Sequence, residues 1–125
     1  MGGNIGTQSA TIVVRGLATG RFNLRDIWRV VLKELAIGLI LGMIYGALIA
    51  VVAQARYSMV PLALAVGLAV LCSMSVAALV GSLVPMLMAR INVDPAVATG
   101  PFVTTAIDIV SVFFYFQIAM TFMTM

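Results

Sequence analysis

The sequence predicts an all-α membrane protein, and three observations lead to that prediction. Hydrophobic residues make up 63% of the 125 residues and charged residues only 9%, whereas a soluble domain usually has about a quarter of its residues charged. Seven of the eleven charged residues lie between residues 15 and 34. The rest of the chain holds three long apolar runs, and only the last of these contains a charge, Asp108.

Each run is long enough for a membrane helix, which needs roughly 20 apolar residues. Backbone groups in hydrocarbon must bond internally, so spanning segments of this kind are helical. We predict one polytopic transmembrane domain over residues 1–125, with helices at about 1–18, 26–54, 58–89 and 95–124. The first is too short to span a bilayer, so we expect it to be the end of a longer helix and the chain to be a fragment.

The distribution of positive charge predicts the orientation. The 15–33 loop carries five Lys or Arg residues and the 90–94 loop adds Arg90, whereas the opposite side has only Arg56. By the positive-inside rule, both loops are cytoplasmic and the C-terminus lies outside, in a cell membrane of the bacterial inner-membrane type. The net charge of +3 is local and indicates a loop facing membrane lipid; no nucleic-acid partner is expected.

Asp108 is the main candidate for a functional residue. A carboxylate in the middle of a bilayer costs about 2.5–3.5 kcal/mol, so it is expected to face a cavity, a partner or a cation. On a helix that begins at Pro95, it would lie roughly 20 Å from the start. Thr104, Ser111 and Tyr115 share its helical face. Two interpretations follow: an ion or proton site, or a carboxylic acid that bonds to a neighbouring helix.

Other segments offer weaker signals. Pro101 lacks a backbone N–H, so the Gly100–Pro101 pair is expected to kink the last helix. Residues 2–8 combine glycines with amide and hydroxyl side chains. Gly38, Gly42 and Gly46 repeat every four residues, which predicts a tight helix–helix contact. Glu34, next to Lys33, is expected to form an exposed ion pair.

The ligand types restrict the chemistry. The chain has no His, and its one Cys, Cys72, lies in an apolar run, so the available ligands are oxygens. Such ligands suit magnesium, calcium or manganese. A symmetric dimer would bring two Asp108 side chains to one axis, where they could face a hydrated dication. No nucleophile–base pair or phosphate loop is found, so an enzyme is not expected, and neither is a cofactor.

Two motifs carry a family resemblance. They are Gly2-Gly3-Asn4-Ile5-Gly6-Thr7-Gln8-Ser9-Ala10-Thr11 with Val14-Arg15-Gly16-Leu17-Ala18, and Asp94-Pro95-Ala96 with Gly100-Pro101-Phe102-Val103-Thr104-Thr105 and Asp108. Together with Lys33-Glu34 before the glycine series, they resemble the MgtE magnesium-transporter family over the whole chain.

The resemblance implies a homodimeric magnesium channel with five membrane helices per chain and a pore along the dimer axis. It implies that Asp108 holds hydrated Mg²⁺ as the transported ion, that backbone oxygens at Thr104 and Gly100 lie along the same path, and that Asn4 lines it. Members of the family begin with a cytoplasmic regulatory region that includes paired CBS domains. No such region is present in these 125 residues, so we expect it in a longer parent chain.

Two rival functions remain open at this point. A proton-coupled solute transporter would use Asp108 as the proton carrier and would show pH-dependent transport. A structural membrane subunit that does not transport would use Asp108 only to pair with a partner protein, and the purified chain would move no ion.

Overall fold

The computed structural model describes residues 2–98 and 100–124 and confirms the all-α fold class, with no strand among those residues. Four α-helices and two short 3₁₀ turns follow one another along the chain. In order they are α1 (Gly2–Ala18), η1 (Leu24–Asp26), α2 (Ile27–Tyr57), α3 (Val60–Arg90), η2 (Pro95–Ala98) and α4 (Pro101–Met123).

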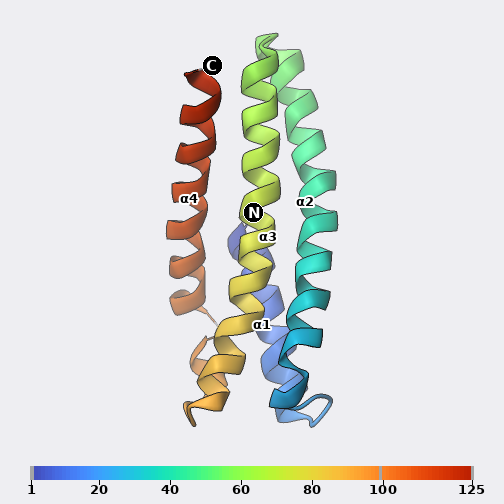
Figure 1. Ribbon diagram of the computed structural model, residues 1–125, viewed down its shortest axis with the longest axis vertical. Helices are drawn as coiled ribbons and strands as arrows, with labels where there is room; N and C mark the ends of the chain where they lie inside the picture. Colours follow the sequence, from blue (N-terminus) through green and yellow to red (C-terminus); the bar gives the residue numbers. More distant parts are fainter. Residues whose placement is uncertain (1, 99, 125) are drawn as a thin grey trace.

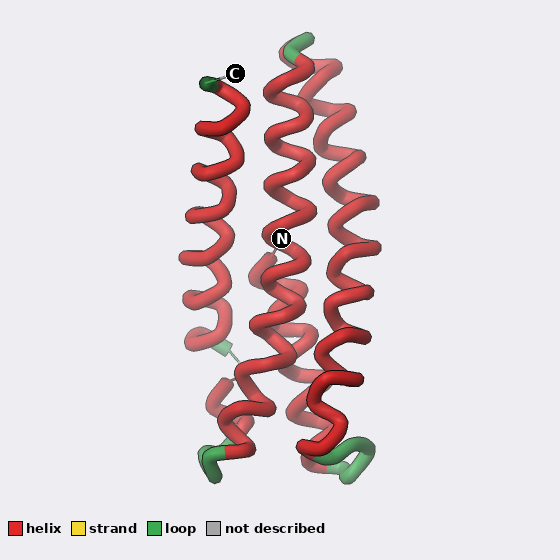
Figure 2. The backbone as a smooth tube through the Cα atoms, in the orientation of Figure 1, coloured by secondary structure: helices red, strands yellow, loops and turns green. Residues whose placement is uncertain are grey.

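Three of these helices run side by side along the length of the molecule, with α3 between α2 and α4 (Figure 1). The same three are long and apolar enough to cross a membrane. The fourth, α1, has 17 residues and occupies only the lower half of the bundle (Figure 1). Loops and turns lie at the two ends, apart from the break before α4 (Figure 2).

Glycines allow α2 and α3 to pack closely against each other. A Cβ atom on Gly38 would lie 2.6 Å from the Ala78 Cβ, and one on Gly46 would lie 2.7 Å from the Gly67 carbonyl oxygen. A Cβ on Gly42 would likewise lie 3.0 Å from the Leu71 Cδ1. The predicted close contact of the glycine series is therefore confirmed, and its partner is α3.

The short helix α1 packs against both α3 and α4. Its Gly6 lies against Ile107 of α4 and the Ala77 carbonyl of α3. Ala10 joins Ala77, Val103 and Ile107 in a buried apolar cluster. This packing places the first turns of α1 beside the first half of α4.

The start of the last helix differs from the prediction. Asp94 does act as a cap, accepting a hydrogen bond from the Ala96 N–H at 3.0 Å, but the turn that follows is the four-residue η2. Gly100 then adopts φ 102° and ψ −143°, and α4 begins at Pro101, not at Pro95. The predicted kink within a helix is wrong for the same reason: a residue that precedes proline avoids the helical region, and proline suits the first helical position.

Candidate functional site

Asp108 lies level with the middle of α3. A Cβ on Gly3 would be 3.3 Å from the Asp108 Oδ1. One turn further along α4, the Ser111 hydroxyl accepts a hydrogen bond from Ser73 of α3 at 2.8 Å. Since Ser73 lies near the centre of a helix that runs from residue 60 to residue 90, Asp108 lies about halfway along the bundle.

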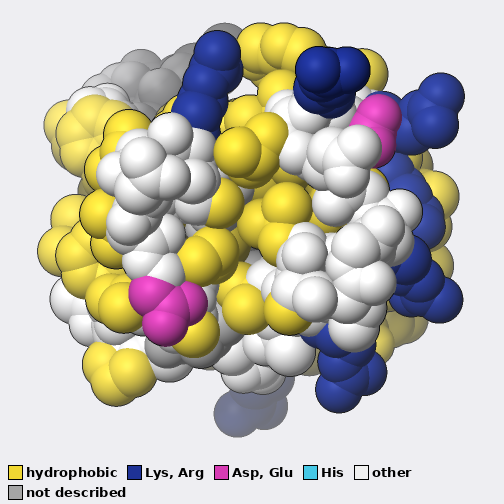
Figure 3. Space-filling view, turned by 90° about the horizontal axis from the view of Figure 1, so that it is seen from below, with side chains coloured by type: hydrophobic (Ala, Val, Ile, Leu, Met, Phe, Trp, Pro, Cys, Tyr) yellow, Lys and Arg dark blue, Asp and Glu magenta, His cyan; other side chains and the backbone are white. Residues whose placement is uncertain are grey.

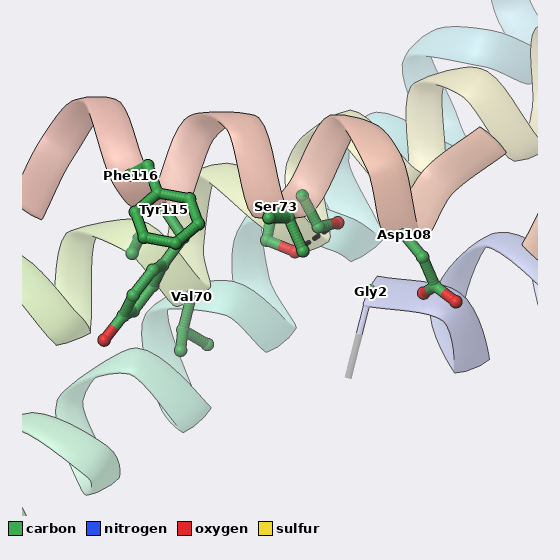
Figure 4. A pocket seen from close by; sticks show the side chains of 9 residues that line it. Gly2, Val70, Ser73, Asp108, Tyr115 and Phe116 are labelled. Carbon is green, nitrogen blue, oxygen red and sulfur yellow. Dashed lines mark hydrogen bonds between the residues drawn. The ribbon is translucent and has the colours of Figure 1, made fainter. Parts of the chain in front are cut away.

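The Asp108 side chain is exposed on the surface of the single chain. Among the described residues of α4, only Val103 and Ile107 are buried. No hydrogen bond or ion pair to Asp108 is found within the described part of the chain. Figure 4 shows its carboxylate projecting from α4 toward the start of α1. The bundle therefore carries an unpaired carboxylate about halfway along its length, within a helix that is otherwise largely apolar.

Hydroxyl groups join α1 to α4 one turn before Asp108. The Thr7 and Thr104 Oγ1 atoms are 3.2 Å apart. The Thr7 Oγ1 also lies 2.8 Å from the Gly3 carbonyl oxygen, and the Thr104 Oγ1 lies 3.0 Å from the Gly100 carbonyl oxygen. Because a hydroxyl has one proton, one of the two donates to its carbonyl and accepts the proton of the other. The Gly100 oxygen also accepts the Thr104 backbone N–H at 3.1 Å. The predicted residues Thr104 and Gly100 are thus directly connected.

A cavity of about 730 Å³ adjoins Asp108 on the side toward the C-terminus of α4 (Figure 4). Its polar lining comes from Ser73, Asp108, Ser111 and Tyr115, and Gly2 of α1 and apolar side chains of α3 and α4 complete it. Three members of the polar stripe predicted on the last helix, Asp108, Ser111 and Tyr115, therefore border one space, whereas Thr104 does not line it.

The structure does not join Asn4 to the other predicted site residues. Its side chain is exposed on α1, one position after Gly3, and no hydrogen bond from it to Asp108, Thr104 or Gly100 is found among the described residues. The polar side chain of α1 that contacts Thr104 of α4 is that of Thr7, which is not among the predicted site residues. The signal that could have identified it is its spacing of four from Gly3, which puts both residues on one helical face.

Glu34 is also not where it was predicted. It is 4% exposed and accepts a hydrogen bond from the Ser9 hydroxyl at 2.9 Å. The expected surface ion pair is therefore wrong, because Glu34 points toward α1 whereas Lys33 is exposed. Glu34 links α2 to α1 near the charged end of the molecule.

The charged ligands available for a metal are few. No group of three or more His, Cys, Asp or Glu side chains that could hold an ion is found among the described residues. Any cation at Asp108 would therefore meet one carboxylate from this chain, supplemented by neutral oxygens. Three membrane-length helices, one of which carries this carboxylate, define a multi-pass membrane protein with a charged residue inside an apolar span.

The family follows from comparison with known proteins. Residues 1–118 match the MgtE family, described as divalent cation transporters. The match covers nearly the whole chain, so the chain belongs to the MgtE family.

Three relatives carry the same name, magnesium transporter MgtE. The protein from Enterococcus faecalis is 45% identical over 121 residues, which is 97% of this chain and 27% of the relative. The Thermus thermophilus protein is 40% identical, over 94% of this chain and 26% of the relative, and the Bacillus subtilis protein is 34% identical, over 98% and 27%. The chain thus spans about a quarter of the length of the relatives it matches.

Proposed function

We propose that this chain forms part of a magnesium-transporting channel, in which two copies face each other and hydrated Mg²⁺ is held at the two Asp108 side chains. The observation that carries the proposal is the unpaired, exposed carboxylate halfway along an apolar bundle. The similarity to three relatives that are named magnesium transporters supports the choice of ion.

The exposure of Asp108 argues for a second copy of the chain. An ionised carboxylate facing lipid at mid-bilayer costs about 2.5–3.5 kcal/mol. Covering the same face with another α4 across a two-fold axis would remove the carboxylate from lipid and set two carboxylates opposite each other. The electrostatic repulsion between them would be relieved by a dication on the axis.

The chemistry of Mg²⁺ suits so sparse a site. Magnesium dehydrates reluctantly and is usually bound through one or two carboxylates while it keeps several waters. Two Asp108 side chains would provide that charge, and the hydrated ion would use the remaining space. Because only its outer waters are contacted, the ion can leave again, as conduction requires.

The neighbouring oxygens would then meet the water shell. The backbone carbonyls of Thr104, one turn before Asp108 on α4, and of Gly100, the residue before α4, would contact these waters, and Asn4 would contribute an amide from α1. The Gly100 oxygen already accepts the Thr104 backbone N–H and lies 3.0 Å from the Thr104 hydroxyl, so we assign it the weakest contact with the ion's waters.

The charge distribution supports a direction for the pathway. Five of the seven basic residues lie between residues 15 and 33, and placing this end in the cytoplasm puts the C-terminus of α4 outside. Magnesium would then pass from the cavity beside Ser111 and Tyr115 to Asp108 and on toward Gly100. The inside-negative membrane potential drives a dication in this direction, by about 2.3 kcal/mol per charge per 100 mV.

The test is magnesium uptake by cells that lack their own magnesium transporters, comparing the full-length protein with its Asp108→Asn variant at matched membrane expression. Asparagine keeps the size and polarity of the side chain and removes only the charge. We expect uptake to fall at least tenfold, since the charge that holds the ion is lost; by transition-state arithmetic, that is about 1.4 kcal/mol.

A matched variant on the same helix separates the site from general damage to α4. Thr121→Val replaces an exposed hydroxyl that bonds only to the carbonyl of Gln117 on its own helix, and it should transport as the parent does. If Asp108→Asn transports magnesium as well as the parent, Asp108 is an assembly or packing residue and the proposed site is wrong.

A further inference from the structure

A basic pocket lies at the charged end of the molecule, away from Asp108. It has a volume of about 370 Å³ and is bordered by the end of α1, the loop after it and the first turns of α2. Three cationic side chains line it, those of Arg21, Arg29 and Lys33. Seen from this end, the Lys and Arg side chains gather mainly toward one side of the bundle (Figure 3).

Two carboxylates also line the pocket, but both are engaged within the protein. The Asp26 Oδ2 accepts the Asn23 backbone N–H at 3.2 Å. Glu34 is 4% exposed and bonds to Ser9. None of the three cations forms an ion pair or side-chain hydrogen bond among the described residues. The pocket therefore holds three cations that have no ion-pair partner against two carboxylates, so its lining has a net charge of +1 (three minus two).

The surroundings of the pocket indicate the level of the lipid headgroups. Trp28, 69% exposed, lies next to Arg29 at the start of a helix that can cross a membrane, the position where interfacial tryptophans are enriched. Beyond Lys33, the same face of α2 continues with Ile37 and Ile40, which are 39% and 54% exposed. A charged pocket thus opens directly onto an apolar surface that lipid chains can cover.

We propose that this pocket binds the phosphate of an anionic phospholipid from the same leaflet, with the acyl chains lying along α2. Basic pockets between membrane helices on the cytoplasmic side are a recognised means of binding such headgroups. The mixture of three cations with the apolar side chains of Phe22 and Val30 fits a phosphate attached to glycerol better than a free ion. The proposal does not depend on the ion path through Asp108.

The experiment is native mass spectrometry of the full-length protein purified in detergent and titrated with dioleoyl phosphatidylglycerol. In the Arg29→Gln/Lys33→Gln variant we expect the apparent affinity for the first bound lipid to fall about 25-fold, since each charge contributes about fivefold, which corresponds to about 1 kcal/mol per residue. The charge-preserving Arg29→Lys/Lys33→Arg variant should bind as the parent does, which separates loss of charge from loss of fold.

Two further variants locate the site. Arg56→Gln removes a charge at the opposite end and Arg90→Gln removes one from the end of α3, outside the pocket, so neither should change binding. The proposal is overturned if phosphatidylcholine binds as tightly as phosphatidylglycerol, or if the double Gln variant binds phosphatidylglycerol like the parent. Displacement of the lipid by an equal concentration of inorganic phosphate would also overturn it, because the site would then serve a soluble anion.

Discussion

The interface between α2 and α3 and the face formed by α1 and α4 belong to one apolar bundle but are built differently. Along α2 and α3, glycines bring two backbones together, and an added Cβ would meet backbone or side-chain atoms at 2.6–3.0 Å. Along α1 and α4, a glycine also packs against Ile107, but two hydroxyl groups meet beside this contact and Asp108 is exposed without a partner.

The difference fits the roles proposed for the two regions. Apolar lipid provides no hydrophobic force between helices, so close packing of small residues holds them together. The α2–α3 interface is therefore complete within one chain. The α1–α4 face leaves Asp108 without a partner from its own chain, which is the property expected of a surface that is completed by another copy and an ion.

The largest effect on stability is expected where the packed interface is broken. Gly46→Leu would place a side chain against the Gly67 carbonyl, 2.7 Å from the new Cβ, and backbone cannot move aside easily. We expect a loss of about 3 kcal/mol, the upper part of the range for overpacking. Denaturation of the purified protein in mixed detergent measures this loss.

Ala36 offers the matched control. It is exposed on the same helix, so Ala36→Leu adds the same side chain outside the interface and should change stability little. If both variants lose the same stability, the glycine contact is not what holds α2 to α3, and the contrast between the two regions fails.

A smaller effect is expected at the break before α4. Gly100 has φ 102° and ψ −143°, a conformation that side chains with a Cβ rarely adopt, although no atom lies within 4 Å of the position of the missing Cβ. Gly100→Ala should therefore lose about 2 kcal/mol through backbone strain alone. Because the break sets where α4 starts, and so the height of Asp108, magnesium uptake should fall as well.

Gly20 provides the comparison for this substitution. It also has a positive φ, 71°, with open space around it, but it lies in the loop after α1. Gly20→Ala should cost about 1 kcal/mol and leave uptake unchanged. Equal losses of uptake in both variants would mean that the conformation of Gly100 does not position the ion site.

The smallest effect is expected for the hydroxyl pair between α1 and α4. Thr7→Val keeps the shape of the side chain and removes its contact with Thr104, so stability should fall by about 1 kcal/mol, the usual contribution of one hydrogen bond. Thr11→Val is the control, since Thr11 is exposed and bonds only to the Thr7 carbonyl of its own helix. A double-mutant cycle of Thr7→Val with Thr104→Val should show coupling; additive losses would contradict a direct contact.

Much of the bundle followed from local pattern. Long apolar runs and the requirement for internal backbone hydrogen bonds were sufficient to predict the three membrane-length helices, and the spacing of Gly38, Gly42 and Gly46 was sufficient to predict a close contact. Asp108 was recognisable because a charge in such a run is costly wherever the helix packs. These are properties of short segments, and each can be evaluated without knowing its neighbours.

The start of α4 could not be predicted in this way. Pro95 and Pro101 are both acceptable first residues of a helix, and Asp94 caps a turn in either case. What decides between them is the conformation of Gly100, which depends on how the end of α3 and the start of α4 pack. The sequence therefore indicated a proline-disturbed region but not that α4 begins after it.

The amino-acid sequence by itself determined the number of membrane-length helices, the glycine contact and the presence of a carboxylate within the apolar span, because each depends on composition and spacing along one segment. Only the tertiary structure decided that Thr7 meets Thr104 and that Glu34 is buried against Ser9. It also decided that Asp108 of α4 is exposed, at the level of the middle of α3. Those features depend on the rotation and height of one helix relative to another, which are set by the packing of many side chains at once.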